Sequence, residues 1–148
     1  MRRLRLMLVI SSSSMGGGEL MFQLLAQYLD QNRVALSLVT PPAEDVRLIA
    51  QERGARYIPL DVPRRLTLRT IRALRDAIRE VAPDIIHTQF FHADLLAWLA
   101  TRGWSRRPLL LTTICGINYH WEVQPLTRKA RYWISSRLYR GIYRSFDG

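Results

Sequence analysis

The sequence predicts an α/β fold in which helices cover both faces of a parallel sheet. Short apolar segments, typical of strands buried on both faces, alternate with segments whose apolar residues recur at helical spacing. The segments between the expected strands are about ten residues or longer, which suits crossovers between parallel strands. A glycine triplet at 16–18 separates the first strand from the first helix. Together these observations predict a Rossmann-like, doubly wound parallel sheet.

The first strand, loop and helix form the most informative part of the sequence. Residues 4–10 are mostly apolar, and apolar residues follow helical spacing from Leu20 to Leu29. Glycines at 16–18 let a ligand come close to the backbone, and the free N–H groups of a helix N-terminus attract an anion. We therefore predict a phosphate-binding loop. A tight turn between strand and helix would also account for the glycines.

The remaining elements follow from apolar patterning and from the residues that end helices. Gly54 and Pro83 are each placed to end a helix. The expected strands are 34–40, 55–60, the neighbourhood of Ile85 and Ile86, and 109–114. The expected helices are 44–53, 66–81, 93–100 and about 126–143. In such a sheet the ligand lies beyond the carboxyl ends of the strands.

Length and composition favour one folded domain. The chain has 148 residues, of which 48% are hydrophobic, so it is large enough to bury a core. A single cysteine, Cys115, excludes an internal disulfide framework and suits a reducing compartment. No apolar run reaches the roughly 18 residues that a membrane span needs. We therefore expect a cytoplasmic protein.

The net charge of +10 is concentrated in the second half of the chain. Mixed aromatic and basic residues in 118–144 suit an anionic lipid surface or a single-stranded nucleic acid. On a helical wheel, however, the arginines do not separate from the apolar side chains. We therefore prefer a helix that packs on the sheet, with the arginine stems lying along the protein surface.

Three common nucleotide sites do not fit the glycine loop. A dinucleotide fingerprint starting at Gly16 would need a glycine at Met21. A Walker loop needs a lysine after its last glycine, and the only lysine is Lys129. A phospho-receiver domain needs acidic residues after the first strand, where serines stand at 11–14. None of these three sites therefore explains the loop, which is either another kind of phosphate site or the tight turn considered above.

Several motifs, taken in order, resemble the N-terminal domain of glycosyltransferase family 4. They are Gly16-Gly17-x-Glu19, PDIIHTQ at 83–89 followed by HADLLAWLA, and RPLLLTTICGIN at 107–118. Members of this family have the GT-B fold, in which two Rossmann-like domains face each other across a cleft, and they transfer a sugar from a nucleotide-sugar with retention. The resemblance implies that residues 1–148 form the N-terminal, acceptor-side domain. The C-terminal donor-binding domain would then be absent from this chain.

The resemblance also implies roles for the glycine loop. The backbone N–H groups of Gly16 and Gly17 would approach the donor diphosphate, with Gly18 beside them. Glu19 would lie in the first helical turn, where the helix dipole favours a carboxylate. Prearranged N–H dipoles and basic side chains would stabilise the leaving diphosphate. The family usually needs no divalent metal, and no residue cluster has metal-like spacing, so we expect neither a metal nor another cofactor.

Residues at two strand ends are expected in the sugar and acceptor cleft. His87 and Gln89 end the fourth strand and can face a sugar or an acceptor hydroxyl, although a hydrogen-bonded core position explains His87 equally well. After the fifth strand the family commonly has a histidine where this sequence has Cys115. A thiol cannot replace an imidazole as a donor to a sugar hydroxyl. Either Asn118 or His120 is therefore expected to take over, or this branch of the family works differently, or the domain is less active.

Two further predictions concern individual side chains. Burial as a small apolar residue is the default interpretation of Cys115. His92 is expected to pack at the start of a helix rather than to bind a ligand. The sequence does not identify a catalytic residue.

The expected function is that of a retaining glycosyltransferase domain that transfers a sugar to a glycan or lipid-linked acceptor, as in polysaccharide biosynthesis. It is expected to be inactive without a C-terminal domain or partner subunit, and a lipid-linked acceptor would place it peripherally at the inner membrane face. Two alternatives stay open: a basic, non-enzymatic Rossmann-like module that binds nucleic acid or phosphate, and a scaffold subunit of a split transferase. The transferase interpretation does not include nucleic acid among the partners.

Overall fold

Five parallel strands form a single sheet in the computed structural model, which describes residues 2–12, 16–61, 67–113, 137, 140–144 and 146. The strands are β1 (Leu4–Ile10), β2 (Val34–Thr40), β3 (Arg56–Pro59), β4 (Ile85–Gln89) and β5 (Leu109–Thr113). Their order across the sheet is β3-β2-β1-β4-β5, and each neighbouring pair is parallel. The direction of winding therefore reverses between β1 and β4, where such sheets bind ligands.

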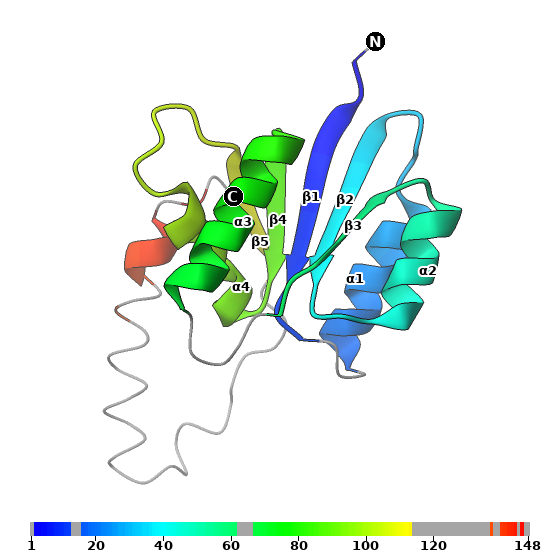
Figure 1. The fold of residues 1–148 in the computed structure, drawn as a ribbon, viewed down its shortest axis with the longest axis horizontal. Helices are drawn as coiled ribbons and strands as arrows, with labels where there is room; N and C mark the ends of the chain where they lie inside the picture. The colour runs from blue at the N-terminus through cyan, green and yellow to red at the C-terminus, as the bar shows by residue number, and fades with distance from the viewer. Residues whose placement is uncertain are drawn as a thin grey trace, which may run out of the picture.

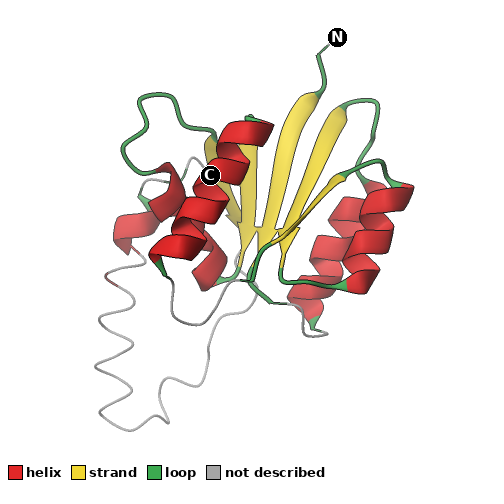
Figure 2. Cartoon of the chain, in the orientation of Figure 1, coloured by secondary structure: helices red, strands yellow, loops and turns green. Residues whose placement is uncertain are grey.

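Helices cover both faces of this sheet, as Figure 1 and Figure 2 show. The helices are α1 (Gly17–Tyr28), α2 (Glu44–Glu52), α3 (Leu68–Val81) and α4 (Phe91–Thr101). The first two pack on one face and the last two on the other. The predicted doubly wound α/β sheet is confirmed. None of the described helices has the length and apolar character needed to cross a membrane.

Alternate residues of β1 point into two separate cores. Met7 and Val9 are fully buried under α3 and α4. Leu6, Leu8 and Ile10 are buried under α1 and α2. Because both faces of the strand are covered, its sequence shows an apolar run instead of an alternating pattern.

The observed element boundaries differ from the predicted ones by at most a few residues. The fourth helix begins at Phe91, two residues before the predicted start, because the chain turns sharply at Phe90, whose φ is 70°. A positive φ is unusual for a bulky residue, so apolar patterning does not predict this turn. Of the expected last helix, 137 and 140–143 are helical, and the rest of it lies outside the described residues.

Candidate active site

The glycine loop leads directly into the N-terminus of α1. Gly16 is the N-cap residue, with extended backbone (φ −148°, ψ 175°), and its carbonyl accepts a hydrogen bond from Leu20 N at 3.0 Å. Gly16 and Gly17 are exposed, whereas Gly18 is buried. Apart from its chain neighbours and the backbone of its own helix, no described atom lies within 4 Å of the position that a Cβ would take on Gly17. The first turn of α1 is therefore open to a ligand at Gly17.

Glu19 folds back over the helix start. A Cβ on Gly16 would lie only 2.6 Å from Glu19 Oε2, so the carboxylate occupies the space beside the N-cap residue. Glu19 is the third residue of the helix, which is the position from which glutamate caps a helix N-terminus. The carboxylate thus competes with an incoming anion at Gly16, which leaves Gly17 as the freer approach.

Strand pairing brings the end of β4 to the edge of the sheet that carries this loop. Ile10, the last residue of β1, pairs with Gln89, the last residue of β4. Gln89 in turn pairs with Thr113 at the end of β5. The glycine loop, Gln89 and Thr113 therefore share the carboxyl edge of the sheet, at and next to the point where the winding reverses.

Gln89 is the most unusual side chain at this edge. It is only 2% exposed, and neither its amide nitrogen nor its amide oxygen has a hydrogen-bond partner in the described part of the chain. A buried polar group without a partner costs about 1–3 kcal/mol. Such a group is rare in native proteins and calls for an explanation. An amide held ready for a ligand provides one.

His87 is half-buried, and one of its ring nitrogens is already bonded. Its Nε2 lies 2.7 Å from Thr113 Oγ1. Burial lowers the pKa of His87 below its usual value, and the nearby Asp94 opposes this effect in part. The imidazole is therefore neutral near pH 7, with one nitrogen directed to the end of β5. Both predictions for His87, a cleft residue and a bonded core residue, are compatible with this position.

The depressed pKa of His87 predicts a loss of stability in acid. The unfolded chain takes up a proton as the pH falls through about 6.5, while the folded chain resists protonation. The free energy of unfolding is therefore expected to fall below pH 6.5 and to level off below the folded pKa. Urea unfolding at a series of pH values tests this. His87→Gln should weaken the dependence of the free energy of unfolding on pH. An equal dependence in wild type and His87→Gln would contradict the assignment.

A buried carboxyl group that the sequence interpretation missed lies next to these residues. Asp94 of α4 is 2% exposed. Its Oδ1 accepts hydrogen bonds from Thr88 Oγ1 at 2.6 Å and Thr112 Oγ1 at 2.8 Å, and its Oδ2 accepts one from Tyr143 OH at 2.7 Å. The carboxyl group thereby connects α4, β4, β5 and the helical residues 140–143. The available signal was an acid among buried helix positions, between Ala93 and Leu96.

The other predicted residues divide into two groups. His92 is half-buried at the second position of α4, and its ring meets Phe91 edge-on with centroids 5.7 Å apart, so the predicted packing at the helix start is confirmed. Cys115, Asn118 and His120 lie outside the described residues. Their roles in the cleft, like those of the glycine loop, His87 and Gln89, stay predictions.

A known sequence family matches most of the chain. The glycosyl transferase 4-like domain family matches residues 16–148. The chain belongs to this family. No curated protein matches the chain. The matched region of this glycosyl transferase 4-like domain includes the glycine loop, the carboxyl ends of β4 and β5, and Asp94.

Solved structures share the fold of the glycosyl transferase 4-like domain. A glycosyltransferase from Rickettsia africae ESF-5 is 16% identical with a TM-score of 0.59, and covers 82% of this chain and 33% of its own. MurG from Acinetobacter baumannii is 15% identical with a TM-score of 0.55, and covers 77% of this chain and 37% of its own. The chain thus spans about a third of the length of these structures.

The same fold also occurs in a protein described as a different enzyme. A Listeria monocytogenes protein described as a UDP-N-acetylglucosamine 2-epimerase is 16% identical with a TM-score of 0.50, and covers 84% of this chain and 35% of its own. At these identities the likeness concerns the fold alone. The family match, and not the fold, therefore identifies the domain as glycosyl transferase 4-like, and the predicted N-terminal GT-B half is confirmed.

Proposed function

We propose that this domain is the acceptor-side half of a glycosyltransferase that moves a sugar from a nucleotide-sugar to a glycan or lipid-linked acceptor with retention. Membership of the glycosyl transferase 4-like family supports the reaction class. The observation that carries the proposal is the shared sheet edge. There β1 leads toward the open first turn of α1, and the neighbouring β4 ends at Gln89, whose amide has no hydrogen-bond partner in the described part of the chain. A diphosphate and a sugar hydroxyl are the chemical groups that such a pair can bind.

Each residue has a distinct part in the proposed reaction. The N–H groups at Gly17 and Gly18 meet the negative charge that grows on the departing nucleoside diphosphate. The Gln89 amide, which can both donate and accept, holds a sugar or acceptor hydroxyl. His87 stays neutral near pH 7 and is oriented by Thr113. We propose that these groups work without a divalent metal, so that a chelator leaves the transfer rate unchanged.

The donor-binding half of the cleft is proposed to come from a C-terminal domain or a partner subunit. Transfer is tested with a panel of nucleotide-sugars, using protein purified from its native host and the separate 148-residue chain. The proposal predicts transfer by the native material and none by the separate chain. Salt-sensitive binding of an oligonucleotide, with no transfer by either preparation, would instead support the non-enzymatic alternative. Transfer that persists unchanged after loss of Gly17 and Gln89 would support a scaffold role.

Substitution of Gly17 distinguishes an effect on ligand binding from an effect on the stability of the fold. Gly17→Ala is expected to leave stability unchanged or slightly higher, because the methyl group meets no described atom and alanine favours a helix. The methyl group does occupy the approach to the N–H groups, so the transfer rate is expected to fall about tenfold or more. Gly141→Ala is the control, since its added Cβ also meets no described atom and Gly141 lies among helical residues. Equal activity of both variants would contradict the role of Gly17.

A further inference from the structure

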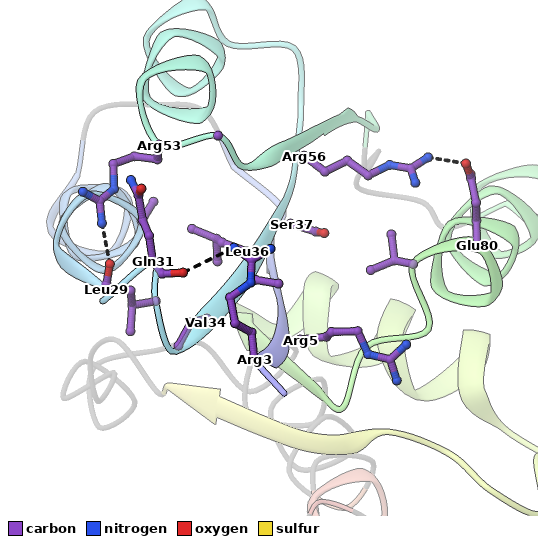
Figure 3. A pocket seen from close by; sticks show the side chains of 14 residues that line it. Arg3, Arg5, Leu29, Gln31, Val34, Leu36, Ser37, Arg53, Arg56 and Glu80 are labelled. Atoms are coloured by element: carbon purple, nitrogen blue, oxygen red, sulfur yellow. Dashed lines mark hydrogen bonds and ion pairs between the residues drawn. The ribbon is translucent and has the colours of Figure 1, made fainter. Parts of the chain in front are cut away.

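A cavity opens at the amino edge of the sheet, opposite the edge that carries the glycine loop. Its volume is about 430 Å³. It lies where β1, β2 and β3 begin and where α1 and α2 end, and Figure 3 shows the side chains that line it. Four arginines line it together with a single acid, Glu80; they are Arg3, Arg5, Arg53 and Arg56. This volume is in the range of small-molecule sites.

Two of these arginines are neutralised by carboxylates. Arg5 donates to Asp84 from its backbone nitrogen at 2.9 Å and from Nη2 at 3.1 Å, and these bonds lower the pKa of the Asp84 carboxyl group. Arg56 Nη2 forms an ion pair with Glu80 at 2.5 Å. Both arginines therefore hold the walls of the cavity in place and add little net charge.

The other two arginines have no carboxylate partner among the described residues. Arg3 Nη1 lies 3.4 Å from the Gln31 carbonyl oxygen, and Arg53 Nη2 donates to the Leu29 carbonyl oxygen. The Nε atom of Arg53 is buried and has no described hydrogen-bond partner. A guanidinium carries five N–H donors, so most donors of Arg3 and Arg53 stay available. The contact with the Leu29 carbonyl holds the Arg53 guanidinium in position without cancelling its charge, while the exposed Arg3 makes only a long contact with a backbone carbonyl.

Capping of α1 does not by itself account for this arrangement. A cation near the C-terminus of a helix is favourable, and the contact of Arg53 with Leu29 is of this kind. The ends of α1 and α2 each carry about half a negative charge, however, whereas the two full positive charges of Arg3 and Arg53 have no carboxylate partner in the part of the chain that the structure describes. The balance at the cavity is positive. Capping also leaves the buried Nε of Arg53 without a partner among the described atoms.

We propose that this cavity binds a phosphate or diphosphate group through Arg3 and Arg53. The planar fork of a guanidinium matches the oxygens of a phosphate and is weakly hydrated, so arginine is well suited to this task. The group belongs either to a free metabolite or to a lipid headgroup, and the two sources share the same chemistry. The site is distinct from the proposed donor site because it lies at the other edge of the sheet, and it does not depend on the proposed transferase activity.

Titration with inorganic pyrophosphate tests the proposal, using calorimetry together with the NMR signals of the arginine Nε–H groups. The double variant Arg3→Gln/Arg53→Gln is expected to weaken pyrophosphate binding about tenfold or more, which corresponds to about 1.4 kcal/mol. The matched control is Arg69→Gln/Arg72→Gln, which removes the same charge from exposed positions of α3. The dissociation constant of this control variant for pyrophosphate should stay within about twofold of the wild-type value. Because Arg3 is exposed, Arg3→Gln alone provides a variant that folds even if the double variant does not.

Flotation with phosphatidylcholine vesicles, with and without phosphatidic acid, identifies the source of the phosphate. Binding to phosphatidic acid that depends on Arg3 and that pyrophosphate displaces indicates a headgroup at the same cavity. Pyrophosphate binding that depends on Arg3, without vesicle binding, indicates a free metabolite. The proposal is overturned if neither ligand binds in a manner that depends on Arg3, or if the α3 control loses as much affinity as the cavity variants.

Discussion

Replacing Gln89 with leucine is expected to make the domain more stable and the transferase less active. The substitution removes two buried polar groups that have no partner among the described residues, and leucine fills a similar volume, so the free energy of unfolding should rise by about 1–2 kcal/mol. The same change removes the amide proposed to hold a hydroxyl in the cleft. We expect transfer by the native enzyme to fall about a hundredfold, because a site built for a hydrogen bond depends strongly on it.

Two measurements test this prediction together. Urea unfolding gives the free energy of unfolding of the chain, and a nucleotide-sugar assay gives the transfer rate. Gln89→Glu is the informative companion, because it keeps the shape but places a carboxyl group in the buried position, and it should lower both stability and activity. A leucine variant that is less stable than wild type would show that the amide has a partner in the native fold. A fully active leucine variant would show that the Gln89 amide does not bind substrate in the cleft.

Replacing Asp94 with alanine is expected to lower the free energy of unfolding by about 3 kcal/mol or more. Thr88, Thr112 and Tyr143 would lose their common acceptor, and the missing side chain would leave a cavity in the core. For a chain of this size the loss corresponds to a fall in Tm of roughly 6–12 °C. Differential scanning calorimetry or urea unfolding gives the comparison with wild type.

Two milder variants show how the loss at Asp94 arises. Asp94→Asn keeps the size and one acceptor oxygen, so its loss should be smaller than that of Asp94→Ala. Tyr143→Phe removes one donor and should cost about 1 kcal/mol. Thr88 Oγ1 and Thr112 Oγ1 also lie 3.1 Å and 3.4 Å from the carbonyl oxygens of Leu111 and Thr88. If Asp94→Ala unfolds at the wild-type midpoint, other acceptors replace the carboxylate, and the described connection between β4, β5 and residues 140–143 contributes nothing to stability.

The fold was predictable because its elements depend on local patterns. β1 is an uninterrupted apolar run, and Pro83 ends α3 as expected, after a C-cap at Ala82. The carboxyl-edge positions of Gly17, His87 and Gln89 follow directly from the parallel order of the strands. These features need only the chain direction and the rule that parallel strands end at the same edge.

The features that the sequence did not predict depend mainly on contacts between segments that are distant along the chain. The partners of Asp94 lie 6, 18 and 49 residues away along the chain, so no periodicity reveals them. The amino-edge cavity is lined by arginines from the starts of β1 and β3 and from the end of α2. In the sequence, each of these arginines taken alone indicates only a solvent-exposed charge. The fold of Glu19 over Gly16 depends on a side-chain rotamer, which a sequence pattern does not determine.

The turn at Phe90 couples the α1–α2 layer to the proposed cleft. Its φ of 70° is costly for an aromatic residue. Phe90 is the N-cap residue of α4, which covers the opposite face of the sheet, yet its side chain packs against the core of Leu6, Phe22 and their neighbours. That packing holds the turn in place directly after Gln89. Mutational libraries confined to the core beneath α1 and α2 should therefore yield variants with altered acceptor preference, because a looser core lets the turn relax and shifts Gln89 without any substitution in the cleft itself.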